Sequence, residues 1–402
     1  MDSVSNIHWD WLKDRLNGLV VCLSHSWGGL EQVAANDALD VGSLGFKIRV
    51  LCLDETPIYE YLKNRKEVEV IPLTYRPRNF FDLKLRAELA DLISQGTNLI
   101  HTHQTSLLGS IVPGIWRQPG VALLATRHIM NNHNKRNFFH RAIYARVDAL
   151  LVISEAVREN VLQTHWLREP HVKVVNLGLD FERFDPAKVD PDQYRAQWGA
   201  DNDTVVIGLV GRVDPAKGQE TFIKAAAGLL KNLRAGEQVK FVMVGDETPP
   251  KPDAPPESFL EELKKIVTQF RIEEHVVFAG FSDQIPEVMR AFDICVMPSR
   301  QEAFGLVAIE AMAMECPVII SRGGSAQEIV GENEDFGLTV RPDDAFHLQQ
   351  QLRYLLDNPM ERVRMGQRAR QHVIANYDRK SRFLKTLKHY EKALRRRQRI
   401  RL

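Results

Sequence analysis

Short apolar runs alternate with amphipathic segments along nearly the whole chain, and this alternation constrains the fold more than any other feature. The segments between the runs, such as 30–44, 82–95 and 155–164, carry apolar residues at helical spacing. Strand, helix and strand in succession predict βαβ units, in which helices cover both faces of a parallel sheet. In the first half, the runs that we expect to be strands are 18–23, 47–53, 68–72, 99–103, 122–126, 149–153 and 172–175.

The second half of the chain repeats this scheme. The chain has 402 residues, which is more than one domain core usually holds. We therefore expect two doubly wound α/β domains, 1–184 and 204–378, joined by a charged, proline-containing linker at 185–203. The proline-rich stretch 249–256 indicates a loop within the second domain. The expected strands of this half are 205–210, 240–244, 276–279, 294–297, 317–320 and 337–340.

The last segment, 379–402, is a basic helix on an otherwise acidic chain. It holds eleven Lys and Arg against one acid, although the whole chain has a net charge of only +1. Phe383, Leu387, Tyr390 and Leu394 fall on one helical face and must pack on something. We expect this helix to cross back to the first domain, with its basic face left to solvent, anionic lipid or an anionic acceptor.

The sequence predicts no membrane span and no secretory signal. Its longest apolar runs are far shorter than the ~20 residues that a spanning helix needs. Asp2, Asp10 and Asp14 stand where a signal peptide would have a basic start and an apolar stretch. The four cysteines are widely spaced, which is typical of buried, reduced thiols. We therefore expect a cytoplasmic protein, with peripheral attachment to the inner face of the membrane as an option.

A glycine-punctuated loop with two cations follows the expected strand 205–210. Arg212 and Lys217 lie five residues apart in it, and a helix is expected to begin at Gln219. A guanidinium fork, a mobile ammonium group and a helix N-terminus together suit a diphosphate. A solvated turn with ordinary surface charges explains the loop equally well when it is taken alone.

Two glutamates follow the expected strand 294–297. Glu302 lies in a loop, and Glu310 lies eight residues later inside a nearly apolar helix. The free amides of Phe304, Gly305 and Leu306 would point at a ligand lying at the helix start. In the simpler alternative, Glu302 caps the helix and Glu310 is a surface acid. A carboxylate buried among apolar residues is costly unless something satisfies it, and ribose hydroxyls could do so.

These motifs resemble those of the retaining GT-B glycosyltransferases of family 4. The motifs match in the second half of the chain, and the expected two-domain architecture matches over nearly the whole chain. It implies two Rossmann-like domains facing across a cleft, with a nucleoside-diphosphate sugar mainly on the second and the acceptor mainly on the first. It also implies retention of configuration at the transferred sugar. The residues that carry it are Gly211, Arg212, Lys217, Gly218, Glu302, Phe304, Gly305, Glu310, Gly323, Gly324 and Glu328.

The resemblance assigns roles to individual positions of the second half. It implies that Arg212 and Lys217 bind the donor diphosphate, and that Glu310 binds the ribose hydroxyls. Glu302 would hydrogen-bond the transferred sugar, together with the helix-start amides. Phe281, in the loop 280–282, would lie by the nucleobase.

The first half carries weaker signals. Gly28 and Gly29 open a helix after the strand 18–23, where a chain without side chains can approach a phosphate. The resemblance assigns the Gly29 amide to the diphosphate, although a plain turn explains it as well. It also makes His128, after the strand 122–126, an active-site histidine that contacts the donor sugar. His101 and His103 are secondary candidates, and the polar segment 129–136 could bind an anionic acceptor.

We expect no cofactor and no metal ion. The Asp-x-Asp spacings at 190–192 and 201–203 lie in the expected linker, and cationic and amide groups can stabilise the departing diphosphate. The expected reaction is transfer of a hexose to a glycan or lipid-linked acceptor, in lipopolysaccharide or other cell-envelope polysaccharide synthesis. A sugar-nucleotide epimerase or a phosphorylase of the same design, and a non-catalytic nucleotide-sugar-binding protein, remain alternatives. A nucleic-acid partner is not expected, because only the basic tail favours one.

Overall fold

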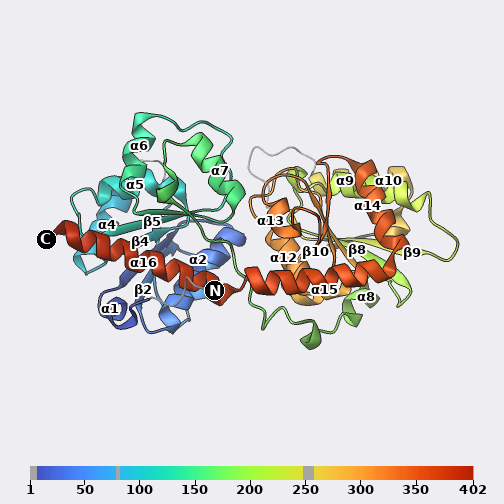
Figure 1. The fold of residues 1–402 in the computed structure, drawn as a ribbon, viewed down its shortest axis with the longest axis horizontal. Helices are drawn as coiled ribbons and strands as arrows, with labels where there is room; N and C mark the ends of the chain where they lie inside the picture. The colour runs from blue at the N-terminus through green and yellow to red at the C-terminus, as the bar shows by residue number, and fades with distance from the viewer. Residues whose placement is uncertain (1–6, 78–81, 248–257, 402) are drawn as a thin grey trace. The chain divides into compact units, whose positions relative to one another are not determined.

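The computed structural model describes residues 7–77, 82–247 and 258–401. These residues form two compact units in Figure 1: one is coloured from blue to green and includes the red C-terminal helix, and the other is coloured from green to red. The first unit comprises Met1–Gly178 together with Arg379–Leu402, and the second comprises Leu179–Asp378. Each unit has a parallel sheet of its own, so the doubly wound α/β fold expected from the sequence is confirmed.

The first unit is built on a seven-stranded sheet in the order β3-β2-β1-β4-β5-β6-β7. All of its neighbouring strands are parallel. Central strands such as β4 and β5 are buried over their whole length, which explains why they are continuous apolar runs in the sequence. The strands are β1 (Asn17–Cys22), β2 (Lys47–Leu53), β3 (Glu69–Leu73), β4 (Leu99–Thr102), β5 (Ala122–Arg127), β6 (Ala149–Val152) and β7 (Val172–Val174).

Several helices of this unit begin at polar residues that the sequence supplies for the purpose. The side chains of Asp82, Asn137 and Ser154 each accept a hydrogen bond from a backbone amide in the first turn of α4, α6 and α7. The helices are α1 (Trp9–Lys13), α2 (Gly29–Ser43), α3 (Pro57–Leu62), α4 (Leu83–Ser94), α5 (Leu108–Gly114), α6 (Phe138–Ala145), α7 (Glu155–Thr164) and α16 (Arg379–Arg401).

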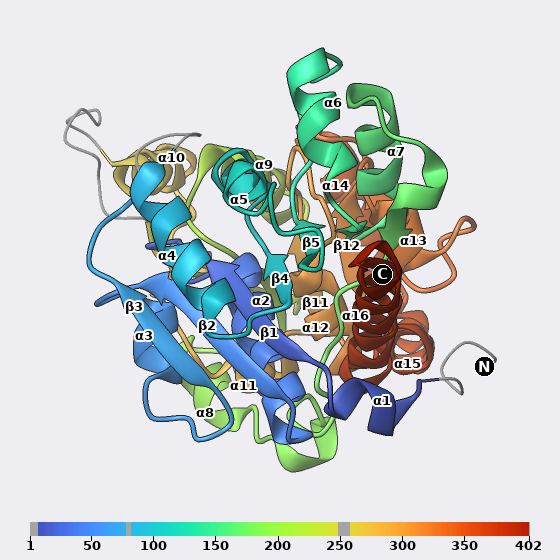
Figure 2. The same ribbon diagram turned by 90° about the vertical axis from the view of Figure 1, so that its left-hand side faces the viewer.

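The C-terminal helix α16 belongs to the first unit, as expected, and it is seen almost end-on in Figure 2. Its apolar stripe enters the same core cluster as residues of α1, α2 and α3, and Leu387 and Tyr390 are fully buried. Its basic face is only partly left to solvent, because several of its arginines form ion pairs within the unit. Arg379 pairs with Asp40, Arg382 with Asp37, and Arg397 with Asp148.

The second unit is built on a six-stranded parallel sheet in the order β10-β9-β8-β11-β12-β13. Its strands are β8 (Thr204–Val210), β9 (Gln238–Val244), β10 (Val276–Gly280), β11 (Ile294–Met297), β12 (Val318–Ser321) and β13 (Leu338–Val340). Its helices are α8 (Asp192–Gln197), α9 (Gln219–Leu230), α10 (Phe259–Phe270), α11 (Ile285–Ala291), α12 (Leu306–Ala313), α13 (Ala326–Val330), α14 (Ala345–Asp357) and α15 (Pro359–Asn376).

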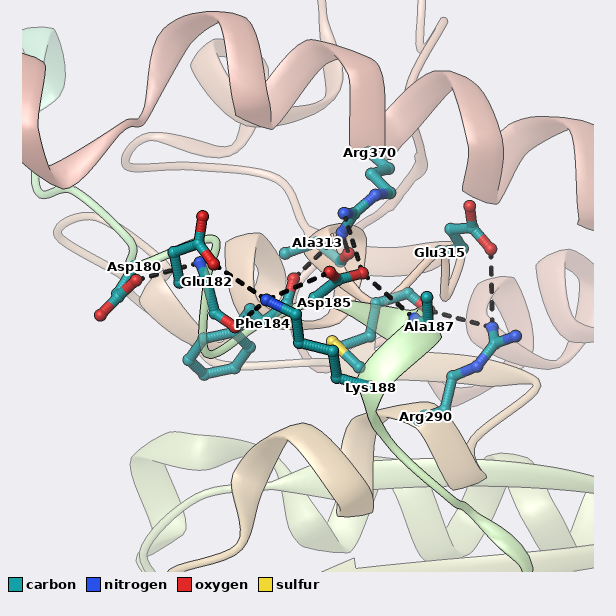
Figure 3. A network of polar contacts seen from close by, with 11 residues as sticks. Asp180, Glu182, Phe184, Asp185, Ala187, Lys188, Arg290, Ala313, Glu315 and Arg370 are labelled. Carbon is teal, nitrogen blue, oxygen red and sulfur yellow. Dashed lines mark hydrogen bonds and ion pairs between the residues drawn. The ribbon is translucent and has the colours of Figure 1, made fainter.

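The stretch 185–203 is where the structure departs from the expected division. The sequence predicts a first domain that ends at residue 184 and a separate linker at 185–203, whereas the units divide between Gly178 and Leu179. Figure 3 shows why this charged stretch is not a free connection: Arg370 of α15 donates to the Phe184 carbonyl at 3.0 Å and lies 3.7 Å from Asp185. In the sequence this charged stretch is typical of a solvated linker, but in the structure Asp185 has a charged partner, Arg370, in the second unit.

Helix α8 adds further anchors to the second unit. Its Arg195 binds the Asp293 carboxylate at 3.0 Å and the Ala291 carbonyl at 3.1 Å, and Trp198 stacks on Phe292. The loop predicted at 249–256 lies outside the described residues. None of the helices in the described part of the chain offers the long apolar stretch that a membrane crossing requires.

Candidate active site

The cationic loop lies between β8 and α9 of the second unit. It contains a short 3-10 turn, Pro215–Lys217, which Asp214 caps by accepting a hydrogen bond from the Ala216 amide. The Arg212 guanidinium is 2.9 Å from the Asp214 carboxylate and is largely exposed. The loop therefore holds the Arg212 cation at its surface. Because its ion pair with Asp214 is exposed and weak, another anion can take the place of Asp214.

The second cation of the loop reaches a residue 85 positions away in the sequence. Lys217 Nζ lies 2.9 Å from the Glu302 carboxylate, and both side chains are partly buried. The backbone joins the same two loops, because the Arg300 amide donates to the Ala216 carbonyl at 3.0 Å. The structure therefore brings Lys217 and Glu302 together at the carboxyl ends of β8 and β11, which are neighbouring strands.

Two glycines shape these loops. Gly218 has a φ of +76° and precedes α9, and a Cβ there would lie 2.1 Å from the Pro298 carbonyl oxygen. Gly305 has a φ of +84° and precedes α12, and a Cβ there would lie 2.8 Å from Ile329 Cδ1. Only glycine adopts this left-handed conformation without strain and also leaves room for such close approaches.

The start of α12 is built from the predicted residues Phe304, Gly305 and Leu306. The Phe304 side chain is buried, and its carbonyl accepts a hydrogen bond from Ser325 Oγ at 2.5 Å. The Phe304 ring is therefore packed in the core, and only the backbone amide of Phe304 remains to bind a ligand. Gly305 and Leu306 begin the helix, so the positive end of the helix dipole lies beside Glu302 in the chain.

Glu310 lies on α12 and is half-buried. Burial raises the pKa of its carboxyl group to about 7, and the charge of Arg183 acts in the opposite direction. Its neighbour Cys295 is affected in the same way, because burial raises the pKa of the thiol to about 12 and the Glu310 charge adds to this. A carboxyl group this close to its midpoint at neutral pH gains from any hydrogen-bond donor that a ligand brings.

This pKa predicts how stability depends on pH. The folded pKa of Glu310 is above the unfolded value of 4.5, so its contribution is fully present below pH 4.5 and is lost as the pH rises through about 7. Between pH 5 and 8, the free energy of unfolding of the wild type should fall on the order of 2 kcal/mol more than that of Glu310→Gln, after an allowance for solvent access. Urea unfolding of both proteins across this range measures the difference, and parallel pH profiles would contradict it.

Phe281 follows β10, directly after Gly280, whose φ is +69°. Its ring is 70% exposed, so a flat base could stack on it. The next residue, Ser282, contacts the Tyr194 hydroxyl at 3.1 Å, which anchors the loop to α8. Phe281 thus lies at the carboxyl edge of the same sheet as the cationic loop.

In the first unit, Gly28 and Gly29 open α2. The Gly28 amide donates to the Glu31 carboxylate at 2.9 Å, and Gly28 has an extended backbone that any residue could adopt. Among the described atoms, nothing lies within 4 Å of a Cβ built at Gly29. Open space in front of a helix N-terminus is what the approach of a phosphate requires.

His128 follows β5 and is 8% exposed. Its Nε2 lies 3.1 Å from His103 Nδ1. Burial, followed by the charge of Arg382, lowers the pKa of His128 to about 3, so the ring is neutral at physiological pH. A neutral imidazole can exchange a hydrogen bond with a sugar hydroxyl, but it does not serve as a protonated acid.

His101, His103 and their partners form a buried group that the sequence does not predict. His101 contacts the Tyr390 hydroxyl and Thr126 Oγ1, each at 2.7 Å. Asp37 faces His103 from α2 and pairs with Arg382 of α16. Asp37 is one of two aspartates in α2, and nothing in the sequence distinguishes it from Asp40 or identifies its partner.

The remaining polar candidates make local contacts, and binding of an anionic acceptor by the segment 129–136 stays a prediction. In the segment 129–136, the Lys135 amide donates to the Thr164 carbonyl at 2.8 Å and Arg136 donates to the Leu162 carbonyl at 2.9 Å, so both are tied to α7. In the Asp-x-Asp stretches, Asp190 accepts a hydrogen bond from the Asp192 amide, and Asp201 accepts one from the Asp203 amide. These aspartates stabilise turns in the manner of Asx motifs.

Two family models match the chain. The model described as Glycosyltransferase Family 4 matches residues 27–183, and the model described as Glycosyl transferases group 1 matches residues 190–372. A D-inositol 3-phosphate glycosyltransferase of Corynebacterium kroppenstedtii is 25% identical over 374 residues, which is 86% of this chain and 81% of the relative.

A further relative and a solved structure are also similar. The UDP-Gal:alpha-D-GlcNAc-diphosphoundecaprenol alpha-1,3-galactosyltransferase of Escherichia coli is 23% identical, over 79% of this chain and 82% of its own. The crystal structure of Anabaena HepE in complex with UDP superposes with a TM-score of 0.80 and 20% identity, over 94% of this chain and 100% of HepE. The two family models leave only residues 184–189 between their matches, and the chain therefore belongs to the GT-B glycosyltransferases of family 4 and group 1 that these models describe.

Proposed function

We propose that this glycosyltransferase moves a hexose, with retention of configuration, from a nucleoside-diphosphate sugar to a glycan or lipid-linked acceptor. The observation that carries the proposal is the 2.9 Å contact between Lys217 and Glu302 on two loops joined through their backbones. The names of the relatives support the acceptor class, since one acts on an inositol phosphate and another on a diphosphoundecaprenol-linked sugar. Structures of HepE with UDP and with UDP-glucose support the donor class.

The geometry suggests how the second unit would use its groups. When the sugar–phosphate bond breaks, negative charge develops on the departing diphosphate. Lys217 would exchange part of its contact with Glu302 for that diphosphate, and Arg212 would leave its exposed pair with Asp214 to bind it as well. Glu302 would then accept a hydrogen bond from a hydroxyl of the transferred sugar, beside the amides that begin α12. Glu310 would bind the ribose hydroxyls.

The donor-binding groups of the first unit complete the proposal. Gly29 would offer its amide to the diphosphate, and neutral His128 would hydrogen-bond the donor sugar. No metal ion is required in this scheme, because the diphosphate charge meets two cations and helix-start amides. Retention would require the acceptor to attack from the side of the leaving group, or a covalent sugar–enzyme intermediate to form.

A role in lipopolysaccharide or other cell-envelope polysaccharide synthesis, at the cytoplasmic face of the membrane, fits the lipid-linked acceptor of the Escherichia coli relative. The arginines at the end of α16 differ in what they could contribute to peripheral attachment. Arg397 is held by Asp148 at 2.8 Å and is nearly buried, whereas Arg396 lies 3.8 Å from the same carboxylate and is about half exposed. Arg396 is therefore better placed to meet anionic lipid.

A ligand screen tests the donor class. We expect one class among UDP-, GDP- and ADP-sugars to raise the melting temperature, since a ligand at about 100 times its Kd stabilises the native state by about 2.7 kcal/mol. The product formed with an acceptor extract, and its anomeric configuration by NMR, then separate the candidates. Conversion of the donor without any acceptor indicates an epimerase, binding without turnover indicates a non-catalytic protein, and an inverted product contradicts retention.

A further inference from the structure

A series of buried polar contacts links His128 of the candidate active site to the last helix of the chain. It runs through His103 and Asp37 to Arg382. The His103 ring lies between two partners: its Nδ1 is 3.1 Å from His128 Nε2, and its Nε2 is 3.6 Å from the Asp37 carboxylate. Asp37 is in turn bound by both Nη atoms of Arg382, one of them at 2.9 Å. All four residues belong to the first unit and are buried.

The protons of this chain of groups can be placed by elimination. Burial lowers the pKa of His103 and of His128, so both rings are neutral near pH 7 and each carries one proton. A contact of 3.1 Å between two imidazole nitrogens needs one proton between them, donated by one ring or the other. Two arrangements are therefore available, and they place the His128 proton on different nitrogens.

The Asp37 carboxylate selects one of the two arrangements. If His103 Nδ1 carried the proton, the bare Nε2 lone pair would face a negative charge in a buried site. If Nε2 carries it, the N–H dipole points at Asp37, and Nδ1 is left to accept from His128. The second arrangement is therefore favoured. The 3.6 Å between His103 Nε2 and the Asp37 carboxylate is too long for a hydrogen bond, but a charge acts strongly on an N–H dipole at this distance when water is excluded.

Arg382 makes this selection possible. A carboxylate buried without a partner would take up a proton and lose its charge. Arg382 compensates the charge of the Asp37 carboxylate by donating to both of its oxygens, and its own charge also contributes to lowering the pKa of His128. Tyr390, eight residues further along α16, binds His101, whose ring centroid is 4.3 Å from that of His103. The same helix therefore holds His101 of β4 directly, and it holds His103, which follows β4, through Asp37.

We propose that Asp37 and Arg382 are positioning residues, which act through His103 to fix the proton of His128 on Nε2 and leave Nδ1 as the acceptor. This inference rests on the proposed function, because it is there that His128 is assigned to the donor sugar. It adds that α16, the last helix of the chain, determines which hydrogen bond His128 can offer to that sugar.

A metal site is the alternative, because ligand atoms of Asp37, His101 and His103 lie within 4.8 Å of one another. The atoms needed for it are already engaged. Both ring nitrogens of His101 have hydroxyl partners, and both Asp37 oxygens bind Arg382. A divalent ion would also have to lie beside a buried guanidinium group, which like-charge repulsion opposes.

The test removes the ion pair without leaving a buried charge. The double variant Asp37→Leu/Arg382→Met replaces both charges by apolar groups, an exchange that proteins often accept without loss of stability. The matched control is Asp40→Leu/Arg379→Met, which removes the ion pair three residues away along each of the same two helices, where both side chains are partly exposed. Thermal unfolding is measured for both.

The first readout is the nitrogen NMR spectrum of histidine-labelled protein, with the His128 signals assigned by their loss in His128→Gln. We expect a protonated Nε2 in the wild type and in the control, and a mixture of both tautomers in the Asp37→Leu/Arg382→Met protein. The second readout is kinetic. Loss of the group that orients a metal-bound histidine lowers activity about 10–100-fold, and we expect a loss of similar size here, in kcat with little change in the donor KM, and no such loss in the control.

Three results would overturn the proposal: an unchanged His128 tautomer in the Asp37→Leu/Arg382→Met protein, an equal loss of kcat in the control, or a stoichiometric metal ion found by elemental analysis in the wild type and missing from that variant. Failure of the proposed function looks different. The wild type would then turn over no nucleotide-sugar, or His128→Gln would leave turnover unchanged, while the NMR spectra would still report on the proton of His128.

Discussion

Replacing Lys217 with methionine is expected to lower kcat about 10²–10³-fold, which is the usual cost of removing one group that stabilises charge in the transition state. The ammonium group is fixed 2.9 Å from Glu302 and is only 35% exposed, so it is already in place before the diphosphate departs. Methionine keeps the length and apolar stem of the side chain but cannot compensate negative charge. Steady-state kinetics with the identified donor measure the loss.

Lys224 on α9 provides a matched control in the same unit. Its ammonium group pairs with Glu220 one helical turn away, and both side chains are about half exposed. Such surface pairs contribute about 0.3–0.5 kcal/mol, so Lys224→Met should change neither kcat nor the melting temperature noticeably. If Lys217→Met retained kcat within about threefold of the wild type, well short of the expected loss, the assigned role of Lys217 would be wrong.

Replacing Gly218 with alanine is expected to destabilise the second unit by about 3 kcal/mol or more. The left-handed backbone costs about 1–3 kcal/mol for a residue with a Cβ, and overlap in a packed region costs about 1–3 kcal/mol more. The overlap is with backbone, since the added Cβ would lie 2.1 Å from the Pro298 carbonyl oxygen. Relief requires the loops that carry Lys217 and Glu302 to separate, so kcat should fall too. Urea unfolding measures the first effect.

Gly236 provides a control that distinguishes the cost of the left-handed backbone from the cost of the overlap with Pro298. Its φ is +86°, similar to that of Gly218, but among the described atoms nothing lies within 4 Å of a Cβ built there. Gly236→Ala should therefore show the backbone cost alone and leave turnover intact. Equal destabilisation by the two substitutions would show that the close approach to Pro298 is not important.

The sheets could be predicted from the sequence because their strands are buried on both faces. Such strands are continuous apolar runs, so the expected 18–23 and 205–210 correspond closely to β1 (Asn17–Cys22) and β8 (Thr204–Val210). The division between the units was harder to place. The charges of 185–203 resemble those of a solvated linker, and only the tertiary structure shows that Arg195 and Asp185 have partners in the second unit.

One part of the candidate site could likewise be predicted from the sequence, and another part could not. Lys217 and Glu302 follow strands that become neighbours, and ligand sites of such sheets lie beyond the carboxyl ends of the strands, so their proximity could be anticipated. Their roles in donor binding stay predictions. The pairing of Asp37 with Arg382 could not be anticipated, because the two lie 345 residues apart. Composition gives the number of arginines in the last helix, but not that Arg382 and Arg397 are the buried ones.

The place of α16 in the chain has a consequence for biosynthesis. The first unit takes its last helix from residues that follow the entire second unit, and Leu387 and Tyr390 of that helix are fully buried in the first unit's core. A ribosome that has made residues 1–378 has therefore produced every strand of the first sheet but not the helix that closes one side of it. The nascent chain must keep apolar surface covered by other means during this time, which is when chaperones are most useful.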